Sequence, residues 1–131
     1  MSQENVELTR RGYEHFNRTG EPDYSVLDPG IVCHDFPELP DTGVYNGHQG
    51  FLTLIANAVE GFDEFRIEPE EFIEAGDRVV VLVRTVGRGK LSGAEVDAQV
   101  AHVWTVRNGK AVELRLYGNR DEALEAAGLR E

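Results

Sequence analysis

The sequence has few of the features that restrict a small protein to one kind of chemistry. Its single cysteine, Cys33, excludes a disulfide within the chain and a zinc site with four thiolate ligands. The longest apolar run, residues 79–83, is far too short to span a bilayer. The N-terminal segment MSQENVELTRRGYEHF is charged and lacks the apolar stretch of a signal peptide. These absences predict a cytoplasmic protein without disulfides or membrane spans.

Basic residues are also scarce. The chain has 13 lysines and arginines against 24 aspartates and glutamates, which gives a formal net charge of -11. This charge repels phosphate backbones and anionic lipid surfaces, so neither nucleic acid nor membrane is an expected partner. It is compatible with a neutral or cationic small molecule. The length of 131 residues, 40% of them hydrophobic, predicts one domain, 1–131, with its own core.

Sequence signatures of cofactor sites are missing as well. No glycine-rich dinucleotide fingerprint occurs, and in GRGKLSG one residue separates Gly87 from Gly89, where a phosphate-binding loop requires four. This segment is predicted to be a hairpin turn. The doublet His34-Asp35 is typical of some metal phosphohydrolases, but the other histidines show no metal-ligand spacing. We therefore expect no cofactor and no metal.

Two segments show helical periodicity. In residues 3–18 an apolar stripe lies opposite the i,i+4 pairs Glu7-Arg11 and Glu14-Arg18. A short helix is predicted over residues 24–27. Residues 48–60 form a second long helix, because apolar side chains recur there and just beyond with helical spacing: Phe51, Leu54, Ile55, Ala58, Val59 and Phe62.

Most of the remaining chain is predicted to form strands. Pro69 indicates an edge strand or a bulge, and Asn108-Gly109 predicts a two-residue hairpin turn. A short C-terminal helix begins at Asn119, which has capping-box spacing to Glu122. Helices followed by an antiparallel meander indicate an α+β fold with the helices packed on one side of the sheet. The predicted strands cover residues 31–35, 65–73, 79–86, 96–106 and 112–117.

The passage IVCHDFPELPDTGVYNGH, residues 31–48, places ionisable and aromatic groups in a proline-containing loop. If its first residues are extended, His34 and Asp35 point to opposite faces, so only one of them lines a cavity. Phe36 and Tyr45 are expected to line a pocket. His102 is interpreted differently, as a packing residue or a subunit contact, because it shares a strand face with apolar neighbours.

Four stretches of sequence carry a resemblance to a known family: ENVELTRRGYEHFNRTGE, CHDFPELPDTGVYNGHQGF, EPEEFIEAGDRVVVLVRTVGRGKLSG and AHVWTVRNGKAVELRLYGNRDEALEAAGLRE. With the order of the predicted elements, they resemble the SnoaL-like family of the nuclear transport factor 2-like superfamily. This resemblance covers essentially the whole chain. It implies a cone-shaped roll, in which a curved antiparallel or mixed sheet and three helices from the N-terminal half enclose a cavity, with a short C-terminal helix. Cofactor-free proton transfer on a carbon acid is the chemistry it implies most often.

Ketosteroid isomerase, a relative in the superfamily, implies a role for Asp35. The general-base aspartate of that enzyme matches Asp35, which makes Asp35 the principal catalytic candidate and His34 the second. Its two oxyanion donors would fall near Gly12 and Ala101, whose side chains cannot donate, so steroid isomerisation is not expected. The resemblance and the helix stripes together predict a cavity lined by Tyr13, Phe16, Phe36, Glu38, Tyr45, Phe51, Ile55 and Gln99.

Two functions remain open at this point. One is a cofactor-independent isomerase, cyclase, hydrolase or dehydratase that acts on a compact apolar or neutral molecule through Asp35. The alternative is a non-catalytic ligand-binding or dimeric interaction module on the same fold.

The strand over residues 96–106 leaves a second choice open. The isomerase comparison directs Gln99, Ala101 and Val103 toward the cavity. If the other face lies between two subunits, both patterns hold, so we expect a homodimer. That other face is the one that periodicity marks as buried: Val96, Val100, His102, Trp104 and Val106.

Overall fold

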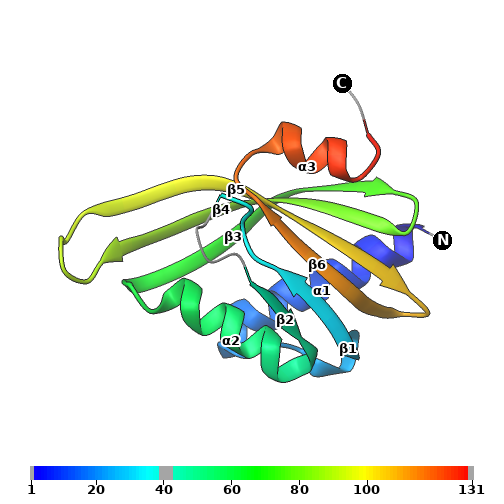
Figure 1. The fold of residues 1–131 in the computed structure, drawn as a ribbon, viewed down its shortest axis with the longest axis horizontal. Coiled ribbons are helices and arrows are strands. Elements are labelled where there is room, and N and C mark those ends of the chain that lie inside the picture. Colours follow the sequence, from blue (N-terminus) through cyan, green and yellow to red (C-terminus); the bar gives the residue numbers. More distant parts are fainter. Residues whose placement is uncertain (1, 39–42, 130–131) are drawn as a thin grey trace.

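A computed structural model describes residues 2–38 and 43–129 (Figure 1). In chain order the elements are α1 (Ser2–Thr19), the 3-10 helix η1 (Tyr24–Val26), β1 (Leu27–His34), β2 (Val44–Asn46), α2 (Gly47–Val59), β3 (Phe62–Ala75), β4 (Arg78–Gly89), β5 (Glu95–Arg107), β6 (Lys110–Tyr117) and α3 (Arg120–Ala126). The strands form one sheet in the order β2-β1-β6-β5-β4-β3, in which only the β1–β6 pair is parallel among the described strands. The predicted α+β class with a mixed sheet is confirmed.

Local sequence signals account for most element boundaries. Asn108 and Gly109 both have positive φ, 53° and 77°, as the two central residues of a type I′ hairpin turn require. The side chain of Asn119 accepts the backbone N–H of Glu122 at 2.9 Å and so caps α3. Pro69 lies in β3, the edge strand, beside a register shift, as predicted. The short strand β2 was not predicted.

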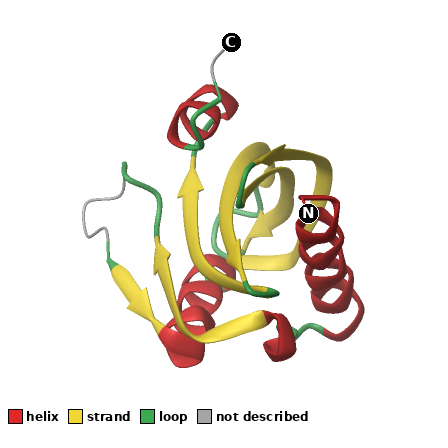
Figure 2. Cartoon of the chain, turned by 90° about the vertical axis from the view of Figure 1, so that its right-hand side faces the viewer, coloured by secondary structure: helices red, strands yellow, loops and turns green. Residues whose placement is uncertain are grey.

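The helices divide between the two faces of the sheet, which curves strongly (Figure 2). Helices α1 and α2 cover the concave face, whereas α3 lies on the convex face, away from the other two (Figure 1). The prediction that all helices pack on one side is therefore wrong for α3. Its apolar side chains, Ala123, Leu124 and Ala127, cover a convex patch formed by Val80, Leu82, Ala101 and Val103.

Strand pairing fixes which residues of β5 share each face. Val81 is paired with His102, and Val83 with Val100, so these side chains lie together on the concave face. The opposite set, which includes Ala101 and Val103, lies under α3. The expectation that Gln99, Ala101 and Val103 point to the cavity is therefore wrong. Since the face with His102 looks inward, it is not a subunit interface, and the homodimer stays a prediction that must use another surface.

No helix among the described residues is long and apolar enough to cross a membrane.

Candidate functional site

A cavity of about 390 Å³ lies between α1, α2 and the concave face of the sheet. Its walls are almost entirely apolar. Helix α1 and the following loop contribute Leu8, Thr9, Gly12, Tyr13, Phe16, Pro22, Asp23 and Val26, and β1 and α2 contribute Leu27, Phe51, Leu54, Ile55, Ala58 and Val59. The remaining lining residues are Phe36 and, from strands β3 to β6, Phe62, Phe65, Ile67, Thr85, Val96, Ala98, Val100, His102, Trp104, Ala111, Leu114 and Leu116.

A chain of three polar side chains crosses this apolar space. The Tyr13 hydroxyl lies 2.6 Å from His102 Nδ1, and the Trp104 indole N–H donates to the same hydroxyl at 2.9 Å. Helix α1 positions Tyr13, while alternation along β5 places His102 and Trp104 on one face. The rings are also in contact, because the Tyr13 ring meets Trp104 edge-on with centroids 6.1 Å apart.

The direction of these hydrogen bonds follows from the available protons. The Tyr13 oxygen accepts from Trp104, so its own proton is free to bond His102 Nδ1. His102 then carries its ring proton on Nε2. His102 Nε2 has no hydrogen-bond partner among the described residues. Every fully buried side-chain nitrogen or oxygen in that part of the chain does have a partner, so Nε2 is not fully buried and must be accessible. Because His102 lines the cavity, its Nε2–H group can donate a hydrogen bond to a molecule in the cavity.

Burial keeps the members of this chain neutral. It lowers the pKa of His102 to about 4, because the protonated imidazole would lose its hydration. It also raises the pKa of Tyr13 well above the usual range, against the smaller opposing effect of the Trp104 hydrogen bond. At neutral pH the site therefore presents an uncharged donor in an apolar cavity, where its hydrogen bonds are strong.

Five of the residues predicted for the cavity do line it. They come from α1, α2 and the segment after β1: Tyr13, Phe16, Phe36, Phe51 and Ile55.

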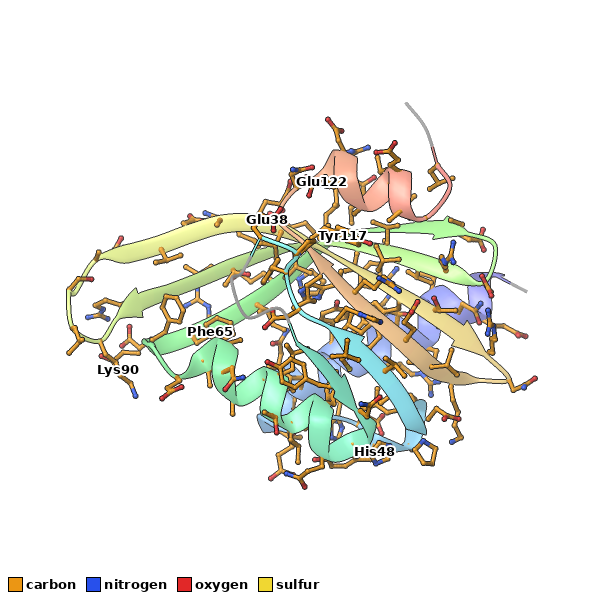
Figure 3. All side chains as sticks on the ribbon, viewed as in Figure 1. Glu38, His48, Phe65, Lys90, Tyr117 and Glu122 are labelled. Atoms are coloured by element: carbon orange, nitrogen blue, oxygen red, sulfur yellow. The ribbon has the colours of Figure 1, made fainter. Side chains whose placement is uncertain are left out.

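The other three predicted pocket residues lie elsewhere. Tyr45 packs beside the core cluster under α2, and its hydroxyl accepts from Asn57 at 3.3 Å. Gln99 is exposed on the convex face and donates to Glu70 at 2.9 Å. Glu38 is exposed and lies near Gly118, at the end of the sheet next to α3 (Figure 3).

The two catalytic candidates also lie outside the lining. His34 is on the convex face, where Nε2 is 3.6 Å from Glu113, and burial, assisted by Arg115, lowers its pKa. The Asp35 carboxylate accepts the backbone N–H of Phe36 at 2.8 Å. Strand β1 ends at His34, so alternation no longer applies at Asp35, and Phe36 is the residue that lines the cavity. The expectation that Asp35 points into the cavity does not match this geometry.

Sequence reasoning missed His102, Trp104 and Thr85 as lining residues. Polar side chains do lie one residue away from Gly12 and Ala101, at Tyr13 and His102, but the Tyr13 hydroxyl is bonded to His102. The available signal was the run of alternate residues on β5, which was assigned to a subunit contact. No three His, Cys, Asp or Glu side chains within the described ranges cluster as metal ligands would.

The fold defines a protein of the NTF2-like class. An NTF2-like protein of unknown function from Burkholderia pseudomallei is 28% identical, with 93% of this chain and 95% of that chain covered and a TM-score of 0.75. A putative SnoaL-like polyketide cyclase from Jannaschia shares the fold at 23% identity, with 88% and 85% covered and a TM-score of 0.74. A family model described as the SnoaL-like domain matches residues 9–114, and the chain belongs to this family.

A further similar structure is TerC, which was co-crystallised with polyporic acid. It is 28% identical, with 95% of this chain and 98% of that chain covered and a TM-score of 0.74. No curated protein matches the chain.

Proposed function

We propose that the protein binds a neutral, largely apolar small molecule in this cavity and hydrogen-bonds a carbonyl or hydroxyl oxygen of that molecule through His102 Nε2. The observation that carries the proposal is the Trp104–Tyr13–His102 chain, which ends at an accessible donor within an apolar wall. The volume of about 390 Å³ lies within the range typical of small-molecule sites.

Electrostatics support a neutral ligand. The net charge of -11 disfavours anions in general. Asp23 brings a carboxylate to the lining, and its hydrogen bonds with Ser25 lower the pKa of that carboxyl group. An uncharged oxygen on an apolar body avoids this repulsion and still satisfies the imidazole. The co-crystallisation of TerC with polyporic acid supports a small organic molecule as the kind of ligand this fold takes.

The same geometry supports acid–base chemistry without a cofactor. A neutral imidazole N–H held by Tyr13 can polarise a carbonyl oxygen and stabilise the negative charge that develops there. On this proposal, His102 would be the electrophilic group of an isomerase or cyclase reaction. The predicted proton-transfer role of Asp35 is a separate hypothesis with its own test.

The binding proposal can be tested with a matched pair of ligands, benzophenone and its hydrocarbon analogue diphenylmethane. Calorimetry, or the fluorescence of the single tryptophan, Trp104, reports their binding. We expect the ketone to bind about three- to tenfold more tightly, since the net value of one neutral hydrogen bond corresponds to about that ratio of affinities.

The substitution His102→Leu should remove the preference for the ketone and leave diphenylmethane binding unchanged. The hydrocarbon thus controls for damage to the cavity. Equal affinity for both ligands in the unaltered protein, or a preference that survives His102→Leu, would contradict the proposal.

A further inference from the structure

Thr85 is a second polar group on the sheet wall of the cavity. The concave positions that precede it in β4 are all valine, Val79, Val81 and Val83, and each is fully buried. Thr85 continues this row, lines the cavity and is half-buried. A valine would fill the same volume, so packing alone does not call for a hydroxyl here.

The Thr85 hydroxyl has no hydrogen-bond partner among the described residues, and the two residues paired with it, Ile67 and Ala98, have apolar side chains. Buried polar side-chain atoms without partners are absent from that part of the structure, so the hydroxyl must be accessible. The other polar lining residues of α1 and β5 are engaged: Thr9 donates to the Asn5 carbonyl, and Tyr13 and Trp104 bond each other. On the sheet, Thr85 and His102 are the two groups left open to a ligand within the described residues.

Strand register gives the separation of these two groups. Thr85 is paired with Ala98, and His102 lies four residues further along β5. At roughly 3.3 Å per residue, the two side chains are roughly 13 Å apart along the wall. Val100, which lines the cavity, and its buried partner Val83 lie between them, so the intervening wall is apolar.

The outer part of the cavity has its own apolar walls. Phe62 and Phe65 lie with ring centroids 5.7 Å apart, and both line the cavity together with Ile67, which is paired with Thr85. Phe62 packs over Gly87, where an added Cβ would lie only 3.3 Å from its ring. Figure 3 shows Phe65 above the end of α2. The lining runs from His102 past Thr85 to Phe65, so the cavity is long as well as apolar.

We propose that the ligand is an elongated molecule with an apolar body and an oxygen-bearing group toward each end, one bonded by His102 and the other by Thr85. This rests on the proposed function, since it takes His102 as the first contact. Valine packing between the two groups selects against polar substituents in the middle of the molecule. A hydroxyl can donate and accept, so Thr85 suits a carbonyl, hydroxyl or ether oxygen.

Thr85→Val tests this directly, because it removes the hydroxyl without changing the shape of the side chain. The probes are straight-chain diols with a hydroxyl at each end and mono-alcohols of the same lengths, with affinity measured by calorimetry. We expect Thr85→Val to weaken the diols roughly three- to tenfold and to leave the mono-alcohols unchanged. The loss should be largest for the diol whose length matches the separation of the two side chains.

Thr105→Val is the matched control, since Thr105 belongs to the convex face of β5 and its hydroxyl donates to Glu113. It should change neither affinity. An unchanged diol affinity in Thr85→Val, or an equal loss for diols and mono-alcohols, would overturn the elongated-ligand proposal while His102 remains the binding group. If His102→Leu left the affinity for the alcohols unchanged, the proposed function itself would be overturned.

Discussion

On its concave face β5 places Val100 and His102 against a cavity, and on its convex face the same strand places Ala101 and Val103 under α3. The concave polar side chains of this strand, His102 and Trp104, are neutral and both bond the Tyr13 hydroxyl. The convex face of the sheet instead carries exposed charged side chains, such as the salt-bridged pair Arg84 and Asp97. One strand thus supplies a wall of the cavity and a part of the opposite surface, separated only by the alternation of side chains.

This difference assigns distinct roles to the polar residues of the two faces. Exposed ion pairs are screened by water and contribute little to stability or selectivity. A neutral hydrogen-bonding group in an apolar cavity is costly to leave unpaired, so it selects strongly for a ligand that pairs with it. The recognition chemistry of this protein is therefore expected on the concave side, despite the concentration of charge elsewhere.

The largest effect expected to distinguish the two faces is the pH dependence of stability that is due to His102. Its folded pKa of about 4 is below the unfolded value of about 6.5, so the unfolded chain binds more protons between these values. The stabilisation is complete above about pH 6.5 and is lost as pH falls toward 4, by about 3 kcal/mol in all. Urea unfolding at a series of pH values should show this slope.

His102→Gln isolates the effect, because glutamine does not titrate. The difference between the unfolding free energies of the unaltered protein and of this variant should decrease by about 3 kcal/mol from pH 7 to pH 4. Parallel curves for the two proteins would mean that His102 titrates normally and is open to bulk water, which would remove the contrast between the faces.

A second prediction compares two valines on neighbouring strands. Val80 is fully buried under α3 on the convex side, whereas Val100 borders the cavity and is half-buried. Val80→Ala should destabilise the protein by about 2 kcal/mol, since it opens a new void in a packed core. Val100→Ala should cost less than about 1 kcal/mol, because it only widens an existing space. Equal costs in chemical denaturation would indicate that the concave face is as tightly packed as the convex one.

Much of the fold could be predicted from the sequence, because its signals are local. Helical periodicity gave α1 and α2, the Asn108-Gly109 turn fixed the last hairpin, and Asn119 marked the start of α3. The family resemblance supplied the cone shape that these signals alone do not determine.

The site was predicted less well, because its geometry depends on contacts between distant elements. Alternation shows that Val100 and His102 share a face, but only the positions of α1 and α3 decide which face is concave. The bond between Tyr13 and His102 joins residues 89 positions apart, which no local pattern reveals. At Asp35 the end of β1 mattered more than alternation, and this end is set by the pairing of β1 with β2 and β6.

The smallest expected effect is that of substituting Asp35. The family resemblance favours Asp35 as the catalytic residue, but Asp35 does not line the cavity. Asn can still accept the Phe36 N–H, so Asp35→Asn should change stability by no more than about 0.5 kcal/mol. It should also change ketone affinity less than twofold, whereas His102→Leu causes about a three- to tenfold loss. A large loss of binding or turnover in Asp35→Asn, with His102→Leu unaffected, would restore Asp35 as the principal group. The reacting oxygen would then lie at the end of β1 rather than against β5.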